Sequence, residues 1–262
     1  MHPPSTVKDH SFALKLFLNP FLICTFPSRL YAVDLVESPV FEEAVSRLVV
    51  APRVALAGQG ELLGRGGVLS LLGLATTRDI FIFDVLMMGM EGFKYGLWAV
   101  LRRRDLVKVV HDVRQLSDLL HHQFEVTLEN VFDTLAAHLV TANWREGPRR
   151  ERAVAPSFGS VVRRHLGIEL EVGQVEGEEW RRRALAPSLL LAAARPLALL
   201  LALGEVLESR LGDPVRGASL ALVTGVREEQ DDRVVEQLLL SPHITPDSMV
   251  VVLPQWMRKS SK

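Results

Sequence analysis

Three apolar segments that follow one another through short connections constrain the fold of this chain more than any other feature. They cover 53–59, 68–76 and 80–85, and each is apolar and β-prone over the length of an ordinary strand. The connection between the first two is rich in glycine, which is typical of a turn between neighbouring strands. The segments therefore predict three antiparallel strands in one sheet.

Helical spacing of apolar residues alternates with short strands in the rest of the chain. A strand at 31–36 precedes a helix at 39–48, for which Ser38 offers an N-cap and Pro39 a first-turn proline. Antiparallel strands that lead into β-then-α units predict an α/β fold, in which helices flank a mixed β-sheet. Further helices are predicted at 92–104, 112–122, 134–140 and 157–166, and short strands at 107–110 and 130–132.

One main domain is expected at 31–210, because α/β folds of this length are often single domains. An N-terminal arm of unassigned structure covers 1–30, and a C-terminal extension covers 211–262. The extension holds a candidate strand at 219–224, a charged helix at 228–240 and a candidate edge strand at 249–253.

An apolar segment at 184–207 is long enough to cross a bilayer. Arg195 and Pro196 lie at its middle, where a charge is costly to insert and a proline removes a helical hydrogen bond. We therefore expect a buried helix of the domain and no membrane association.

The single cysteine, Cys24, cannot form an internal disulfide and supplies no zinc cluster. The apolar stretch at 12–26 is interrupted by Asn19 and Pro20, and no small-residue cleavage site follows it. A reducing compartment is predicted, and we expect the protein to be cytoplasmic.

Three segments carry a resemblance to a known nuclease family. They are 54–85, with Leu63-Gly64-Arg65-Gly66-Gly67 between its strands, then Lys108-Val109-Val110-His111-Asp112-Val113-Arg114, and then Asn130-Val131-Phe132-Asp133-Thr134. In this order they resemble the RNase D-like 3′-to-5′ exonuclease domain of the DEDD superfamily, in the branch that contains Egalitarian and the exonuclease 3′-5′ domain-containing proteins. The resemblance implies a ribonuclease H-like fold.

In active members of that family, four carboxylates hold two metal ions, which activate water and stabilise the leaving oxygen. The resemblance aligns two of these acids with Ala57 and Gln59 on the first strand, and a third with Leu116. The last motif aligns with Ala192 and Pro196, and no carboxylate occurs at 184–204. Since none of these degenerate equivalents is a carboxylate, we expect no catalytic residue and no metal site.

Four nearby acids, Glu61, Asp112, Asp118 and Asp133, offer an alternative in which substituted carboxylates rebuild a site for Mg²⁺ or Mn²⁺. The favoured interpretation is structural: Glu61 is a loop charge, Asp112 caps a helix, Asp118 is exposed and Asp133 is a turn or cap residue. His111 ends an apolar strand, and a structural role is favoured for it too.

Nucleic-acid binding must depend on local basic clusters, because a net charge of −1 provides no global attraction. Arginine clusters are also common on solvated surfaces. Trp144 and Trp180 lie beside such clusters in the sequence, and each is expected either to stack on a base or to pack inside the domain. Further clusters lie at 149–152 and 163–165. The candidate residues for phosphate contact are Arg65, Arg102, Arg103, Arg104, Lys108, Arg114, Arg181 and Arg182.

The resemblance favours a degenerate exonuclease-like domain that binds nucleic acid, most naturally RNA, as an adaptor in RNA metabolism or in small-RNA (piRNA) pathways. Such a module needs no cofactor, and it allows protein partners in an RNA-processing complex and a homodimer. An active metal-dependent exonuclease and a purely protein-binding remnant remain the alternatives; the last would show no RNA affinity at low salt.

Overall fold

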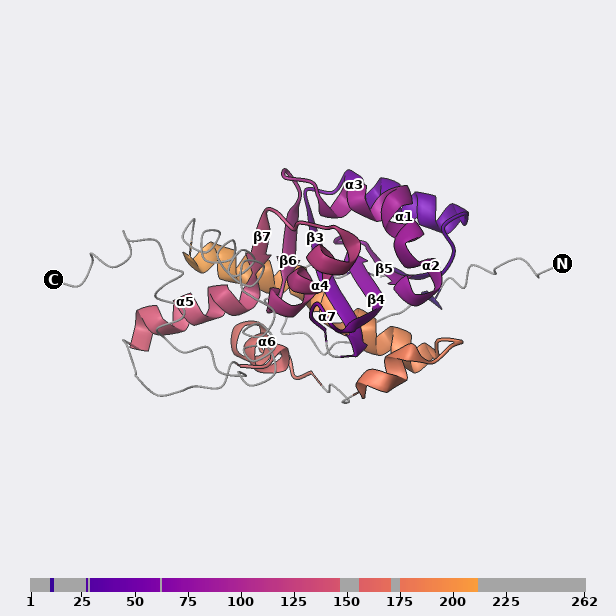
Figure 1. Cartoon of the computed structure of the whole chain (residues 1–262). Helices are drawn as coiled ribbons and strands as arrows, with labels where there is room; N and C mark the ends of the chain where they lie inside the picture. Colours follow the sequence, from indigo (N-terminus) through magenta and orange to yellow (C-terminus); the bar gives the residue numbers. More distant parts are fainter. Residues whose placement is uncertain are drawn as a thin grey trace.

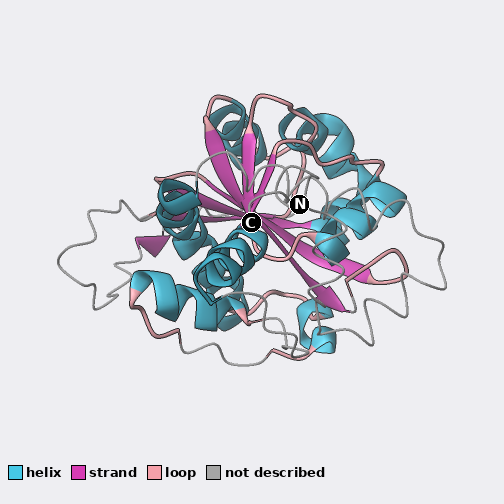
Figure 2. Cartoon of the chain, turned by 90° about the vertical axis from the view of Figure 1, so that its left-hand side faces the viewer, coloured by secondary structure: helices cyan, strands magenta, loops and turns pink. Residues whose placement is uncertain are grey.

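A computed structural model describes residues 10–11, 27, 29–61, 63–146, 156–170 and 175–211. A seven-stranded mixed sheet, with strand order β1-β2-β5-β4-β3-β6-β7, forms its centre (Figure 1). Helices cover both faces, as Figure 2 shows. The α/β fold with a mixed sheet flanked by helices is therefore confirmed.

The three consecutive apolar segments form β3 (Arg53–Glu61), β4 (Val68–Ala75) and β5 (Asp79–Asp84), and adjacent members of this set pair antiparallel as predicted. Strand β3 extends beyond the predicted end, so that Gly60 lies in the strand and not in a turn. The pairing with β4 shifts register between Gln59 and Gly60. A Cβ atom on Gly60 would lie 1.9 Å from the carbonyl oxygen of Val68, so this bulge requires glycine.

Three strands, β2, β6 and β7, run parallel to a neighbour that lies nearer the centre of the sheet. β2 (Arg29–Val33) pairs with β5, β6 (Val107–Val110) with β3, and β7 (Val131–Asp133) with β6. The two-residue β1 (His10–Ser11) pairs antiparallel with β2. Strands β2, β5, β3, β6 and β7 therefore all end at one edge of the sheet, the edge at which open α/β sheets carry their ligand sites.

One face of the sheet is covered by α1 (Pro39–Val49), α4 (Arg114–Phe124) and a broken helix between β5 and β6. The Ser38 hydroxyl accepts a hydrogen bond from the amide of Phe41, which confirms the predicted N-cap of α1. The broken helix consists of α2 (Val85–Gly92), the π-helical turn η1 (Phe93–Leu97) and α3 (Trp98–Leu101).

The prediction began this broken helix too late, at residue 92. It begins at 85 because the Asp84 carboxylate at the end of β5 accepts a hydrogen bond from the amide of Met87. Gly89 interrupts the helical spacing, since its φ of 54° lies outside the helical region.

The opposite face is covered by α5 (Thr134–Glu146), α6 (Phe158–Leu166) and α7 (Pro187–Leu211). The short 3₁₀ turn η2 (Gly177–Arg181) precedes α7. Helix α7 is long and apolar enough to cross a membrane by length and composition, but it packs across β3, β4, β5 and β6. Leu197 approaches β4 so closely that a Cβ on Gly73 would lie 2.3 Å from its Cδ1 atom. This packing is what the prediction of a buried helix requires.

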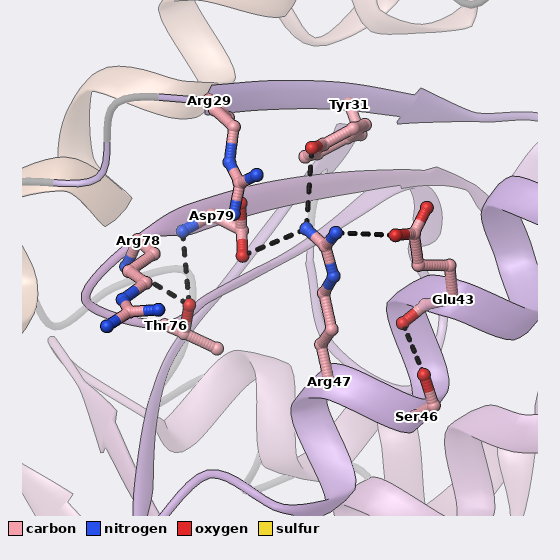
Figure 3. A network of polar contacts seen from close by, with 8 residues as sticks. All are labelled: Arg29, Tyr31, Glu43, Ser46, Arg47, Thr76, Arg78 and Asp79. Atoms are coloured by element: carbon pink, nitrogen blue, oxygen red, sulfur yellow. Dashed lines mark hydrogen bonds and ion pairs between the residues drawn. The ribbon is translucent and has the colours of Figure 1, made fainter.

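A polar network holds α1 against the amino ends of β2 and β5, at the edge opposite the carboxyl ends of the strands (Figure 3). The buried Asp79 carboxylate pairs with Arg29 at 2.7 Å and with Arg47 at 3.2 Å. Arg47 also pairs with Glu43 at 2.5 Å and donates to the Tyr31 hydroxyl at 3.4 Å. Two arginines of this edge are thus engaged with carboxylates.

The candidate strands at 219–224 and 249–253 and the candidate helix at 228–240 lie outside the described residues.

Candidate functional site

A cavity of about 650 Å³ opens at the carboxyl ends of β3 and β6. Its floor is the end of β3 from Leu56 to Gln59, and one wall is the segment from Val110 to Leu116, where β6 leads into α4. Ser157 to Ser160, at the amino end of α6, and the middle of α7 close the opposite side. The volume lies within the range of roughly 300–1,000 Å³ that is usual for ligand sites.

The cavity brings together four of the five positions that the resemblance aligns with metal-binding and water-orienting residues. Ala57, Gln59, Leu116 and Pro196 all line it, although they come from β3, α4 and α7. Ala192 is not among the lining residues and lies one helical turn before Pro196. The bulge after Gln59 turns the end of β3 at this point.

Leu116 lines the cavity beside the end of β3. Its side chain is buried and lies against Gly58, where an added Cβ would be 2.7 Å from the Leu116 Cδ1 atom. A divalent ion here would lose water ligands against methyl groups and gain no carboxylate oxygen, which makes binding unfavourable. The residues at the aligned positions therefore do not fit a two-metal centre.

Two carboxylates do line the cavity, and each is paired with an arginine. Asp112 accepts two hydrogen bonds from Arg114, at 2.6 and 2.7 Å, and this contact raises the pKa of the Arg114 guanidinium. Glu169 lies 3.6 Å from Arg163. In the described part of the chain, no group of three or more His, Cys, Asp or Glu side chains is placed to hold a metal ion.

The other substitute acids lie in separate structural contacts. Asp133 is buried, and its carboxylate accepts hydrogen bonds from the amides of Asp112, Val113, Leu135 and Ala136. Burial raises the pKa of Asp133 to about 6. Glu61 ends β3 and pairs with Arg181 at 3.0 Å.

Three structural interpretations from the sequence need correction. Glu61 was expected to be a loop charge, but it is the last residue of β3 and pairs with Val68 of β4. Asp118 was expected to be exposed, but it is fully buried because the Arg65 backbone amide and guanidinium both donate to it. Asp112 was expected to cap a helix, but α4 has no side-chain cap, and Asp112 adopts a φ of 55° while pairing with Arg114. The cap interpretation of Asp133 agrees with its hydrogen bonds to the first turn of α5.

His111 lies at the cavity wall with its Nδ1 atom 2.9 Å from the Thr134 hydroxyl. That hydroxyl donates to the carbonyl of Val110, so it accepts the hydrogen bond from the imidazole. Desolvation lowers the pKa of His111 to about 4, which keeps the ring neutral at physiological pH. These contacts fit the structural role that the sequence favoured.

Two of the eight basic candidates are internal to the domain. Lys108 is fully buried, and its ammonium donates to the carbonyls of Arg103 and Glu129, so it does not reach a phosphate in this structure. Burial lowers its pKa to about 8. Arg65 is bound to Asp118 and fixes the turn between β3 and β4, where Gln123 also donates to the carbonyls of Arg65 and Gly67.

Three more candidates lie at the amino edge of the sheet, away from the cavity. Arg102 covers the Trp98 ring at 4.1 Å, and Arg103 pairs with Asp105. Arg104 pairs with Glu129 and remains largely exposed. Because they follow α3 and precede β6, they do not converge with the other candidates.

The remaining three, Arg114, Arg181 and Arg182, lie toward the carboxyl ends of the strands. Arg114 is paired with a cavity acid, Arg181 is half exposed beside Glu61, and Arg182 is the most exposed of the three, 4.0 Å from Glu179. The cluster at 149–152 and the side chain of Trp144 lie outside the described residues, whereas Trp180 is buried and so packs inside the domain.

Sequence reasoning missed two residues of the cavity, Gln115 and Phe158, and it named Arg163 only as part of the basic cluster at 163–165. The sequence predicted a helix at 157–166, but it gave no indication that the amino end of α6 would line the same cavity as the end of β3. Gln115 directly precedes Leu116, which the resemblance aligns with a metal ligand. Its position next to Leu116 was the one signal that could have identified Gln115 as a cavity residue.

No protein-family model matches the chain. Mouse piRNA biogenesis protein EXD1 is 34% identical over 164 residues, which cover 59% of this chain and 29% of that protein. The EXD1 protein of Bombyx mori is 28% identical over 202 residues, which cover 75% of this chain and 62% of the relative. The chain thus matches less than two thirds of the length of either relative.

Among solved structures, Trypanosoma brucei RNase D superposes with a TM-score of 0.69 at 20% identity, over 87% of this chain and 82% of the other. The same enzyme in complex with the RNA U12 gives a TM-score of 0.64 at 20% identity, over 82% and 80% of the two chains. The chain therefore carries an exonuclease-like domain with the fold of RNase D, as the three sequence segments indicated.

Proposed function

We propose that this chain is an exonuclease-like domain that binds RNA without cutting it and serves as an adaptor in RNA metabolism. The observation that carries the proposal is the cavity itself. Ala57, Gln59, Leu116 and Pro196 converge there, as metal ligands would have to, and none of them is a carboxylate. Catalysis by two metals depends on those ligands.

Support against a rebuilt centre comes from the partners of the nearby acids. Asp118 is bound to Arg65, Asp133 is bound to backbone amides, and Glu61 is bound to Arg181. A carboxylate that is already held by an arginine or by backbone amides has fewer lone pairs and less uncompensated charge available for a cation. The active-nuclease alternative therefore has no specific contact in its favour.

Support for RNA comes from the similar proteins. Two relatives are named for piRNA biogenesis, and the same fold has been solved in a complex with RNA. Arg181 ends η2, which packs beside β3, and Arg182 follows it; both side chains are exposed enough to contact phosphates. The proposal includes a small-RNA pathway in the cytoplasm, with protein partners or a second copy of the chain as further components.

The test is a combined binding and trimming assay on purified protein. Labelled single-stranded RNA is incubated with Mg²⁺, with Mn²⁺ and with EDTA. We expect binding in all three conditions and no shortening of the RNA. Metal-dependent trimming that is abolished in Asp112→Asn and retained in Arg182→Ala would overturn the proposal. If the protein has no RNA affinity at low salt, the domain would instead be a protein-binding module.

A further inference from the structure

We infer that His138, His165 and Arg210 form a proton-sensitive latch, which joins the carboxyl ends of α6 and α7 to α5 and opens when its imidazoles take up protons. Each side chain comes from a different helix: His138 from α5, His165 from the last turn of α6 and Arg210 from the last turn of α7. Both imidazoles are buried. None of the three residues lines the cavity, so the latch is separate from the candidate site and does not depend on RNA binding.

The arginine fixes the direction of each hydrogen bond in the latch. Arg210 Nη1 lies 2.7 Å from His165 Nδ1, and a guanidinium can only donate. His165 Nδ1 therefore accepts, and the neutral ring carries its proton on Nε2. That nitrogen lies 2.8 Å from His138 Nδ1 and donates to it, so His138 has no proton on Nδ1 either. One arginine thus determines the protonation of both rings.

Proton uptake at either ring conflicts with this arrangement. A charged His165 carries an N–H at Nδ1, which faces the donor of Arg210 and brings two cationic groups into contact. A charged His138 directs an N–H from Nδ1 at the Nε2 proton of His165. Burial of both rings further disfavours their charged forms. The closed latch therefore requires two neutral imidazoles.

The surrounding helices add positive charge. Among the side chains that the structure describes on α5, on α6, on α7 and directly after β6, the other charged or titratable groups are His111, Arg163, Arg164, Arg195, Glu205 and Glu208. With Arg210, helices α6 and α7 hold four arginines and two glutamates, and Glu208 is paired with Arg53. Desolvation, with a smaller contribution from His138, lowers the pKa of His111 to about 4 and keeps it neutral. An excess of positive charge on α6 and α7 also opposes protonation of the latch.

Opening of the latch should be local. Leu166 and Leu207 lie near the latch residues in sequence and are buried in the apolar core, and these contacts do not depend on the hydrogen bonds. Proton uptake should therefore release the last turns of α6 and α7 without unfolding the domain. An exposed histidine has a pKa near 6.5, so each ring that binds a proton only in the open state raises the opening equilibrium about tenfold between pH 7.5 and pH 5.5.

The test is amide hydrogen exchange of the full chain at pH 7.5 and pH 5.5, corrected for the intrinsic exchange rate. Peptides that cover 160–167 and 203–211 should open at least about tenfold more at pH 5.5, whereas a peptide that covers β4 should not change. In the His138→Gln/His165→Gln double variant, amides keep one donor and one acceptor at each position and bind no proton, so this acceleration should disappear. His122→Gln is the matched control, because His122 lies on α4 beside Asp118, and it should retain the acceleration.

A second measurement on the wild type does not require that the double variant folds. The imidazole nitrogen chemical shifts at pH 7.5 should show both rings protonated at Nε2 and unprotonated at Nδ1. Arg210→Met should free His165 Nδ1 to bind a proton in the closed state, and it should therefore weaken the acceleration at pH 5.5. A proton on His165 Nδ1 at pH 7.5, exchange that is equal at the two pH values in the wild type, or an acceleration that persists in the double variant would each overturn the latch.

Discussion

Replacing Arg65 separates a structural role from an RNA-binding role more clearly than any other single change. Asp118 is fully buried, and the Arg65 guanidinium lies 2.9–3.3 Å from its oxygens. Arg65→Ala removes this partner, but the hydrogen bond from the residue-65 amide, 2.7 Å long, does not depend on the side chain. Breaking a buried pair usually costs roughly 3–5 kcal/mol, and the surviving bond places the expected loss near the lower value, about 3 kcal/mol.

The measurement is the free energy of unfolding in urea for Arg65→Ala, with Arg182→Ala as the control. Arg182→Ala removes an exposed ion pair with Glu179 and should lower that free energy by less than about 1 kcal/mol. For a domain of this size, about 3 kcal/mol also corresponds to a melting temperature lower by roughly 6–12 °C. RNA affinity, measured where both variants are folded, should be the same for Arg65→Ala and the wild type. A stable Arg65→Ala protein whose affinity depends less steeply on salt than that of the wild type would refute the reasoning, because it would make Arg65 a phosphate ligand.

Three further changes test groups that hydrogen-bond inside the domain. Lys108→Met should cost about 1–3 kcal/mol in urea denaturation, because two carbonyls lose their donor, while RNA affinity stays unchanged. Asp133→Asn should cost a similar amount, since an amide nitrogen cannot accept the backbone hydrogen bond that one carboxylate oxygen now accepts; equal stability at pH 7 would contradict this geometry. The folded-state pKa of His111, about 4, lies below the ordinary value of 6.5, so the unfolded chain binds the proton first and this residue removes up to about 3 kcal/mol of stability as pH falls from 6.5 to 4. His111→Gln should therefore lose less stability than the wild type over that pH window, as measured by denaturation at each pH.

Much of the sheet could be predicted because its pairing is local in sequence. The segments that form β3, β4 and β5 are joined by short turns, and such neighbours pair antiparallel. The position of β2 beside β5 could not be predicted, because 45 residues separate Val33 from Asp79 and no local pattern encodes a parallel pair. Helix α2 was placed too late for a related reason: its start depends on the Asp84 cap and its interior on the Gly89 break.

In the candidate site too, features encoded locally in the sequence could be predicted, and contacts between distant residues could not. Its aligned positions on β3 and α4 could be located because the flanking motifs are contiguous in sequence, and the structure places these positions in one cavity. The partners of the basic residues could not be located, since the contact of Arg65 with Asp118 spans 53 residues and that of Lys108 with Glu129 spans 21. A cluster of arginines in a sequence contains no information on which of them are already paired.

The proposed loss of the acids is compatible with the survival of the fold for a physical reason. A two-metal site holds several carboxylates close together, and without metal their mutual repulsion and desolvation destabilise the folded state. An apolar side chain at such a position removes that penalty and adds buried surface, as Leu116 does where it joins the core beside Gly58. Gln59, at the floor of the cavity, is polar and partly exposed. Under the proposed function, selection for binding alone would therefore favour Leu116 and Gln59 at these positions, which is consistent with an intact RNase D fold.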